Sequence, residues 1–298
     1  MRKKLGGHAW FTLGALLTAW ALLFGSTWWL VKHAESFKRL AGCGSDTMAP
    51  LVDRWAASFL EGKEATAIGY RGGGSQHGLG TYLYQEIDFF ASSRELSAQE
   101  RGIAKARGFE PVVFVVAWDG LAIVVHPSSP VESLTLDHVR RLFAGDMANW
   151  KAAGGHDEPV QCFARDKDSG TETFFAQRVL QGDAYAPATR HLATNVAIVE
   201  AVARTVGGIG FVGLEHAREA RGAVKIVALA GHESEGSVLP AADTILSGAY
   251  PLARPLRLYT RGQPEGLLGD FVRFCRSEDG QRIAAEAGYL PEAALESF

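Results

Sequence analysis

Three short stretches of this 298-residue chain combine glycine, hydroxyl side chains and charge in a way that suits the binding of an anion. They are residues 44–50 (GSDTMAP), 72–78 (GGGSQHG) and 165–171 (RDKDSGT). Each stretch separates an apolar run from an amphipathic one, so we expect a strand to end and a helix to begin there. The first N–H groups of a helix lack partners and carry partial positive charge, and Ser or Thr adds a hydroxyl donor.

The simpler interpretation of each stretch is helix capping, because Ser and Thr cap helices in all kinds of proteins. Three such stretches in one chain, with Arg165 four residues before Ser169, favour an oxyanion site. A guanidinium offers a planar fork of donors that matches the oxygens of phosphate or sulfate. In an α/β fold the carboxyl ends of parallel strands form one edge of the sheet, where all three stretches can meet.

The hydrophobic pattern predicts the strands and helices that position these three stretches. From residue 37 on, short apolar runs alternate with amphipathic stretches, which indicates an α/β fold. We expect strands at 37–43, 65–70, 87–91, 160–164, 209–212, 225–229 and 256–259. We expect helices at 50–60, 78–85, 97–107, 136–143, 171–180, 195–206, 267–275 and 280–287.

The apolar run at 111–126 is broken only by Trp118, Asp119 and Gly120. It is too long for one ordinary strand. It predicts either two strands or one strand that passes from a first lobe into a second.

Composition excludes some classes of protein. The chain is 47% hydrophobic and 21% charged, which is typical of a globular protein. Its net charge is −3, so a general electrostatic affinity for nucleic acid is not expected. The first 31 residues hold three of the 30 basic residues and no acid, which leaves 27 basic against 33 acidic residues, or −6, in the remainder. Any anion bound by this body must therefore be held by local groups.

The N-terminus predicts a membrane anchor. Residues 9–31 form a run of 23 residues without a formal charge. A helix of that length spans roughly 35 Å, enough for a bilayer core. Trp10 and Trp28 lie at its ends, as interfacial aromatic residues do, and basic residues at 2–4 precede it. The positive-inside rule then leaves the N-terminus in the cytoplasm and the rest of the chain outside.

Two alternatives for this segment stay open. The sequence at 19–21 (AWA) fits a signal-peptide cleavage pattern, but cleavage there leaves an apolar mature N-terminus at 22–31. The sequence at 40–43 (LAGC) resembles a lipobox, yet charged residues separate it from the apolar run. We therefore prefer Cys43 as a core residue at the end of the first strand. All three interpretations place the body outside the cytoplasmic membrane.

The sequence gives little indication of disulfides, a metal site or catalysis. The three cysteines, Cys43, Cys162 and Cys275, allow one disulfide at most and lie too far apart in sequence for a zinc motif. We expect no metal and no cofactor. His77 lies near Ser75, so a phosphoester hydrolase that uses Ser75 or Ser169 stays as an alternative, although nothing supplies its general base convincingly.

Several of these segments carry a resemblance. Residues 44–50, 74–75 (GS), 91–94 (ASSR), 119–122 (DGLA) and the R-x-x-x-S-G-T turn at 165–171 resemble the phosphate-binding proteins of bacterial phosphate ABC importers. The similarity runs from about residue 41 to residue 289, and the R-x-x-x-S-G-T turn is its most specific element.

The resemblance implies a type II periplasmic-binding-protein fold with two lobes. An N-terminal region at 1–36 precedes lobe I, at 37–116 plus 255–298, and lobe II, at 117–254. It also implies that inorganic phosphate binds in the cleft between the lobes and passes to permease subunits of the inner membrane.

The resemblance also implies a set of phosphate-binding residues. The hydroxyl and amide of Thr47 and the amide of Met48 bind the oxyanion from the first lobe, and Arg165 supplies the main countercharge from the second. The full set carried over by position is Ser45, Thr47, Met48, Ser75, Ser93, Arg94, Arg165, Ser169, Gly170 and Thr171.

One position departs from the family pattern. Family members place an Asp after the Ala-Ser of the third strand, as acceptor for the proton of hydrogen phosphate, and here Ser93 stands there. A Ser hydroxyl accepts a hydrogen bond but does not repel sulfate as a carboxylate does, which leaves selectivity open. Asp46 is the candidate proton acceptor, ahead of Asp166 and Asp168. Arg94 is expected either to contact the ligand or to pair with Glu95 or Asp46.

The expected function is thus binding and delivery of phosphate without catalysis, by a single-pass membrane protein whose body lies in the periplasm or extracytoplasmic space. A tethered sensor of phosphate, sulfate or molybdate that feeds no transporter is the alternative within the same fold. No nucleic-acid partner is expected.

Overall fold

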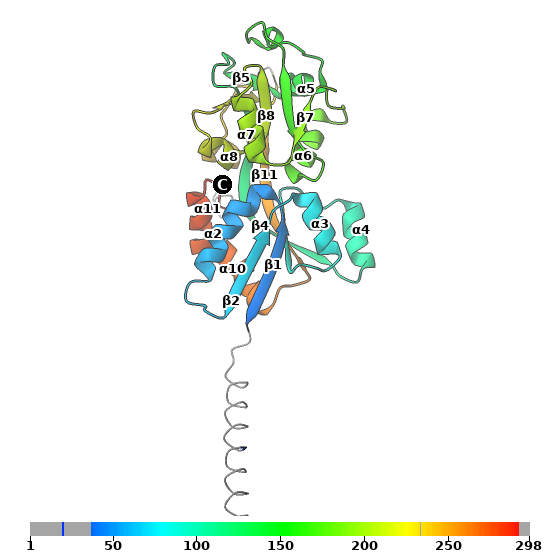
Figure 1. The fold of residues 1–298 in the computed structure, drawn as a ribbon, viewed down its shortest axis with the longest axis vertical. Helices are drawn as coiled ribbons and strands as arrows, with labels where there is room; N and C mark the ends of the chain where they lie inside the picture. Colours follow the sequence, from blue (N-terminus) through cyan, green and yellow to red (C-terminus); the bar gives the residue numbers. More distant parts are fainter. Residues whose placement is uncertain (1–19, 21–36, 233, 292–298) are drawn as a thin grey trace, which may run out of the picture.

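The computed structural model describes residues 20, 37–232 and 234–291, which form two lobes stacked along the long axis of the molecule (Figure 1). The predicted anchor at 9–31 lies outside the described residues, apart from Trp20. Among the helices that are described, none is both long and apolar enough to cross a bilayer.

The first lobe is built around a parallel sheet with β1 between β2 and β3. Its strands are β1 (Lys38–Gly44), β2 (Thr66–Arg71) and β3 (Phe89–Ser92). Its helices are the 3-10 turn η1 (Asp46–Met48), α2 (Ala49–Phe59), α3 (Ser75–Leu83), α4 (Ala98–Ala106), α10 (Gly266–Arg276) and α11 (Glu278–Glu286). Figure 1 shows α2, α10 and α11 on one face of this sheet and α3 and α4 on the other.

The second lobe has its own sheet, with β6 between β7 and β8. Its strands are β6 (Gln161–Arg165), β7 (Arg190–Leu192), β8 (Gly208–Gly213) and β9 (Lys225–Ile226), with β5 (Ser133–Thr135) and β10 (Ala228–Ala230) in a separate pair. Its helices are α5 (Leu136–Ala144), η2 (Trp150–Ala153), α6 (Gly170–Phe175), the π-helical turn η3 (Ala176–Leu180), α7 (Asn195–Ala203), α8 (Leu214–Glu219) and α9 (Ala242–Leu246).

Two long antiparallel strands join the lobes. Strand β4 (Pro111–Val125) pairs with β11 (Ala253–Arg261) through its first ten residues and with β8 through Leu121–Val125. Of the two possibilities for the apolar run at 111–126, the single strand that passes between lobes is therefore the one observed. The sheet order β2-β1-β3-β11-β4-β8-β6-β7 places these strands at its centre.

Each lobe encloses apolar side chains of its own. In the first lobe, Leu51, Trp55 and Phe59 of α2 are buried against the sheet, as the four-residue spacing of large apolar side chains predicts. In the second lobe, the rings of Phe175 and Phe211 stack at a centroid distance of 4.0 Å within the core. The lobes are thus separately packed bodies joined by two strands, an architecture that permits hinge motion.

The predicted elements occur with a few differences. Helix α3 begins at Ser75, three residues earlier than predicted, because Gly74 (φ +96°) ends the turn and leaves Ser75 in the first helical turn. The strand predicted at 225–229 is split between β9 and β10, which pair with different strands. The helix predicted at 171–180 is α-helical only to Phe175. Strands β5 and β7 and helices α8 and α9 were not predicted.

All three cysteines are buried free thiols. Cys43 lies in β1 with 1% of its surface exposed, which confirms the interpretation of this residue as part of the core.

Candidate anion-binding site

The three glycine- and hydroxyl-rich stretches meet where the lobes face each other. Each is a strand-to-helix turn, as predicted: β1 leads into η1, β2 into α3, and β6 into α6. Thr47, Ser75 and Ser169 on these turns are all at most 2% exposed. The carboxyl ends of parallel strands from both lobes therefore form one polar centre.

Direct contacts between the lobes define this centre. The hydroxyl oxygens of Thr47 and Thr171 lie 3.1 Å apart. The Gln76 amide donates to the Asp168 carbonyl oxygen at 2.8 Å. A Cβ built on Gly170 would lie 2.3 Å from the Ser75 hydroxyl oxygen, so only a glycine permits this approach. The lobes are closed upon each other at the site.

Arg165 is the buried cation of the second lobe, with 1% of its surface exposed. Its Nη2 donates to Asp46 Oδ2 and to the Ala193 carbonyl oxygen, each at 2.6 Å, and its Nη1 donates to Asn195 Oδ1 at 3.2 Å. Arg165 Nε and Asn195 Nδ2 are buried and have no hydrogen-bond partner among the described residues. Two unpaired buried donors beside a guanidinium match an acceptor-only ligand such as an oxyanion.

Asp46 lies between Arg165 and the glycine-rich turn. Its Oδ1 accepts from the Gly73 amide at 2.7 Å, and its Oδ2 accepts from Arg165. A carboxylate held in this way supplies an acceptor next to the site, as a proton acceptor for the ligand requires.

Ser75 and Ser93 form the first-lobe side of the centre. Their hydroxyl oxygens are 3.4 Å apart, and the Ser93 amide donates to the Ser75 hydroxyl oxygen at 3.3 Å. Across from them, the Ser169 hydroxyl caps α6 by accepting from the Thr171 and Glu172 amides. The simpler capping interpretation therefore holds for Ser169. Its hydroxyl oxygen accepts these two bonds, and its proton remains available for donation to another acceptor.

Arg94 is engaged in its own lobe. It forms a bidentate pair with Glu100, at 2.7 and 2.8 Å, and also donates to Gln76 Oε1 at 2.7 Å. Neither the Glu95 side chain nor Asp46, the predicted partners, pairs with it. Burial opposes ionisation of Glu100, but the hydrogen bonds from Arg94 and from the Ser97 backbone outweigh it and hold the pKa of that carboxyl below its ordinary value.

The two remaining predicted residues stand just behind the site. The Ser45 amide donates to the Ala91 carbonyl oxygen, and the Ser45 carbonyl oxygen accepts from the Tyr70 hydroxyl. The Met48 amide donates to the Ser45 carbonyl oxygen at 3.2 Å, and the Met48 side chain is buried in the first-lobe core. In this closed form, then, the Ser45 and Met48 amides stabilise the turn around Thr47.

Two charged residues at the centre were given no role from the sequence: Asp119 was noted only within the 111–126 and 119–122 segments, and Arg254 was not noted. Arg254 on β11 and Asp119 on β4 form a buried ion pair with an N–O distance of 2.9 Å, and both side chains are 1% exposed. Arg254 also donates to the hydroxyls of Thr47 and Thr171. The available signal was Asp119, the one charged residue within the apolar run at 111–126, since such residues are rarely buried without a partner.

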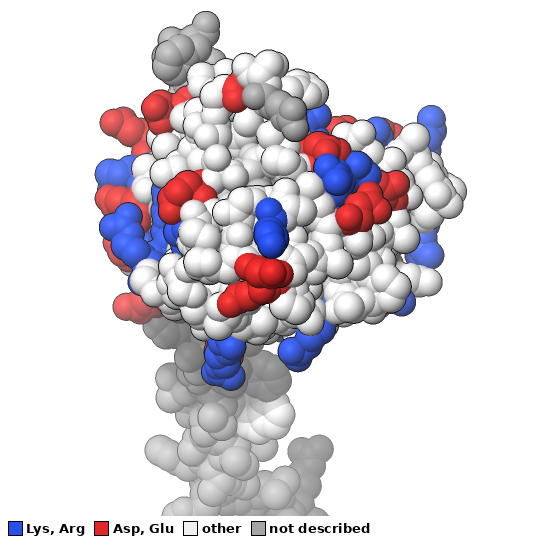
Figure 2. Space-filling model, turned by 90° about the horizontal axis from the view of Figure 1, so that it is seen from above, with Lys and Arg blue, Asp and Glu red and all other residues white. Residues whose placement is uncertain are grey.

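The charge at the site is local. Seen from above, the second lobe presents Lys and Arg side chains interspersed with Asp and Glu (Figure 2). Neither sign of charge dominates this face of the molecule. Burial raises the pKa values of the nearby Asp166 and Glu172 carboxyls above their ordinary values.

Comparison with known proteins identifies the family. A sequence profile of the PBP superfamily domain matches residues 31–279. The phosphate-binding protein PstS of Bacillus subtilis (strain 168) is 30% identical over 254 residues, which cover 83% of this chain and 79% of that protein. The PstS of Pseudomonas aeruginosa (strain PAO1) is 28% identical over 269 residues, covering 85% and 82%. The chain belongs to the PstS-like phosphate-binding proteins of the PBP superfamily.

Solved structures show that this PstS-like chain has the predicted fold. A putative phosphate ABC transporter substrate-binding protein from Clostridium perfringens, solved with bound phosphate, superposes with a TM-score of 0.74 at 24% identity, over 85% of this chain and 99% of that one. An ABC-type phosphate transport receptor from Vibrio cholerae gives 0.69 at 25% identity, over 84% and 99%. The α/β two-lobed periplasmic-binding-protein fold is therefore confirmed.

In the described part of this PstS-like chain, the geometry does not join Ser75 to His77 as a hydrolytic pair. Ser75 contacts Ser93, while the His77 side chain is exposed and no bond joins it to Ser75. Within the described part of the chain, no group of three or more His, Cys, Asp or Glu side chains is arranged to hold a metal ion.

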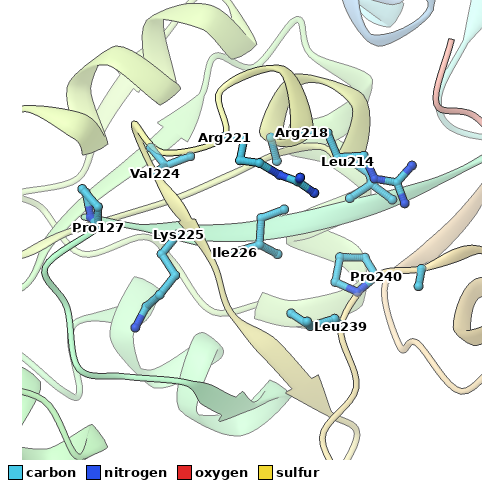
Figure 3. Close-up of a pocket in the computed structure, with 11 residues that line it drawn as sticks. Pro127, Leu214, Arg218, Arg221, Val224, Lys225, Ile226, Leu239 and Pro240 are labelled. Carbon is cyan, nitrogen blue, oxygen red and sulfur yellow. The ribbon is translucent and has the colours of Figure 1, made fainter.

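A separate cavity of about 530 Å³ lies in the second lobe (Figure 3). Arg218, Arg221 and Lys225 line it together with apolar residues such as Leu214 and Leu239. None of its lining residues belongs to the three turns, so this cavity is not the anion site. Arg218 donates to the Gly288 carbonyl oxygen and Lys225 pairs with Glu132, so two of its cations already have partners.

Proposed function

We propose that this chain binds inorganic phosphate between its two lobes, outside the cytoplasmic membrane, and delivers it to an ABC importer. The observation that carries the proposal is the meeting of Thr47, Ser75 and the Arg165–Thr171 turn in one buried polar centre. Its relatives PstS of B. subtilis and PstS of P. aeruginosa are phosphate-binding proteins by name, which supports phosphate as the ligand.

The ligand shell we propose draws on both lobes. Thr47, Ser75 and Ser93 donate from the first lobe, and Arg165, Ser169, Gly170 and Thr171 from the second. Asp46 accepts the proton of hydrogen phosphate, because it is the carboxylate that touches Arg165 directly. We assign Arg94 a supporting role, since its guanidinium already holds Glu100 and Gln76.

Phosphate enters when the lobes open. The moving units we propose are lobe I, at 37–116 plus 255–298, and lobe II, at 117–254, and they rotate about the strands that cross between them. Closure brings Arg165 and Thr171 onto an anion held by Thr47 and Ser75, and it excludes water.

Calorimetry tests the ligand directly. The full-length chain, purified in mild detergent, is titrated with phosphate, sulfate and molybdate. We expect heat of binding with phosphate. Clear binding of sulfate or molybdate without any heat from phosphate would show that the site takes a different oxyanion.

The uncharged segment at 9–31 favours a second possibility for the same fold, a tethered sensor. A protein fixed in the membrane does not diffuse freely between its source of ligand and a permease. Cell fractionation with N-terminal sequencing decides between anchor and cleaved signal. Phosphate uptake by cells that lack the gene then separates the roles, because loss of uptake is expected only of a transporter component.

A further inference from the structure

Asn195 belongs to a fourth strand-to-helix turn, which lies beside the three turns of the anion site. Strand β7 ends at Leu192, and α7 begins at Asn195 after the N-cap residue Thr194. This turn contacts Arg165 twice, because the Ala193 carbonyl oxygen accepts from Nη2 at 2.6 Å and Asn195 Oδ1 accepts from Nη1 at 3.2 Å. Strand β7 pairs in parallel with β6, so the carboxyl ends of both strands point to the same polar centre.

The contact with Arg165 fixes which way the Asn195 amide points. A guanidinium only donates hydrogen bonds, so the amide atom that faces Arg165 Nη1 must be the oxygen. An exchange of the two amide positions would set two donors against each other. The amide nitrogen is bonded to the same carbon as the oxygen and therefore also lies next to the guanidinium. Nδ2 is thus a donor with a defined place beside Arg165.

This donor is buried and has no acceptor. Asn195 is 1% exposed, and its Nδ2 lacks a hydrogen-bond partner among the described residues. The same holds for Nε of Arg165, since the bonds from Arg165 to Asp46, Ala193 and Asn195 use only its Nη atoms. An unsatisfied buried donor costs on the order of 1–3 kcal/mol. A ligand rich in acceptor oxygens would remove that cost for both side chains.

We propose that Asn195 is a further binding residue of the anion site, whose Nδ2 donates to an oxygen of the bound tetrahedral oxyanion while its Oδ1 holds Arg165 in place. This inference rests on the proposed function, because it adds a residue to the same ligand shell. A hydrogen bond from a neutral amide to an anion is charge-assisted, so it strengthens binding without changing the net charge of the site. The N-terminal end of α7 carries partial positive charge and favours an anion at the same point.

The first test uses the wild-type chain. Asn149 and Asn195 are the only asparagines in the sequence, so an isotopic nitrogen label on asparagine side chains gives one NH2 signal for each in an NMR spectrum. Asn149 Nδ2 donates to Asp157 Oδ1 at 3.0 Å and provides the internal reference, which Asn149→Leu identifies by removing it. On addition of phosphate, we expect the Asn195 signal to shift and its hydrogen exchange with water to slow on the order of tenfold. The Asn149 signal should stay unchanged.

The second test measures phosphate affinity by calorimetry on the full-length chain. Asn195→Leu replaces the amide with an apolar side chain of similar size. We expect affinity to fall on the order of 30-fold or more, because a ligand donor and the support of Arg165 are both lost. Asn149→Leu is the matched control, since it removes the N-cap of η2 in the same lobe and should lower thermal stability while leaving affinity unchanged.

A double-mutant cycle separates a direct bond to the ligand from an effect through Arg165. In an Arg165→Met background the guanidinium is absent, so any remaining effect of Asn195→Leu on affinity comes from the amide and the ligand. We expect a further loss of about fivefold or more in that background. A loss below about twofold would make Asn195 only a support for Arg165 and would overturn the proposed bond. The NMR test needs no variant at position 195, so it still decides if the leucine variant does not fold.

Failure of this inference differs from failure of the proposed function. If wild type binds phosphate while the Asn195 amide signal neither shifts nor slows in exchange, Nδ2 does not donate to the ligand and the inference is wrong. If wild type binds sulfate or molybdate and not phosphate, the proposed function fails, and both tests with that oxyanion still decide the role of Asn195. Binding of no oxyanion at all would overturn both.

Discussion

The hydroxyls of Thr47 and Thr171 are 124 positions apart in the sequence, yet their oxygens lie 3.1 Å from each other. One follows a strand of the first lobe and the other lies in the first turn of a helix in the second. Their contact closes the interface between lobes at the place where the anion is expected. The predictions below test whether that interface is a ligand site.

Arg165 is expected to carry most of the charge-assisted binding. Arg165→Ala removes a buried guanidinium and leaves Asp46 without its partner, so we expect phosphate binding to weaken by about 2–5 kcal/mol. Calorimetry on wild type and variant measures this directly. Arg204→Ala, which removes an exposed arginine from the end of α7, is the control and should have no effect. A loss of less than tenfold in affinity for Arg165→Ala would mean that Arg165 does not contact the ligand.

Gly170→Ala tests the closeness of the lobes. The added methyl would lie 2.3 Å from the Ser75 hydroxyl oxygen and 2.7 Å from that of Ser93, atoms of the opposite lobe. We expect the lobes to stay folded while closure is blocked, with affinity reduced on the order of 100-fold, since several ligand donors act only in the closed form. Small-angle scattering with phosphate present should show a more open molecule than wild type. Gly80→Ala, where an added methyl meets no atom within 4 Å, is the matched control.

Ser93→Asp tests selectivity. The new carboxylate would lie in the buried position that Ser93 occupies beside Ser75. Because it accepts a proton from hydrogen phosphate but repels sulfate, we expect sulfate affinity to fall at least tenfold more than phosphate affinity. Competition titrations of each anion against the other provide the ratio. Ser93→Ala, which removes the hydroxyl without adding charge, should leave the ratio close to that of wild type.

Glu215 is expected to make stability depend on pH. Burial, helped by the neighbouring Glu219, raises the pKa of Glu215 from 4.5 to about 7. The folded chain therefore holds a proton that the unfolded chain has lost between these values, and stability falls as pH rises through that window. Glu215→Gln stays neutral, so above pH 7 it should be more stable than wild type by on the order of 1 kcal/mol. Thermal unfolding from acid to neutral pH measures the difference, and Glu61→Gln, an exposed site, should follow wild type.

Local chemistry explains why much of the architecture was predictable. The spacing of Leu51, Trp55 and Phe59 defines the buried face of α2, and the run at 111–126 marks the strand that joins the lobes. Each of the three turns contains glycine and hydroxyl residues next to the start of a helix. These signals lie within a few residues of one another, so periodicity and capping rules detect them.

The partners of the charged residues could not be found by such rules. The expected partners of Arg94 were its sequence neighbour Glu95 and Asp46, whereas its observed partner is Glu100, in the first turn of α4. Arg254 was overlooked because the strand predicted there began only at residue 256. Its carboxylate partner lies 135 positions earlier, on β4. Asp46 was predicted to lie near the ligand. Its ion pair with Arg165 was not predicted, because the two residues are 119 positions apart in the sequence.

The sequence by itself determined which turns carry donors for an anion, which helices and strands present them, and which family the chain resembles, because these properties depend on residues close together along the chain. Only the tertiary structure decided which charge pairs with which, and that Arg254, paired with Asp119, donates to one hydroxyl from each lobe. Those choices depend on distances between lobes, and such distances are set by packing and strand register rather than by spacing in sequence.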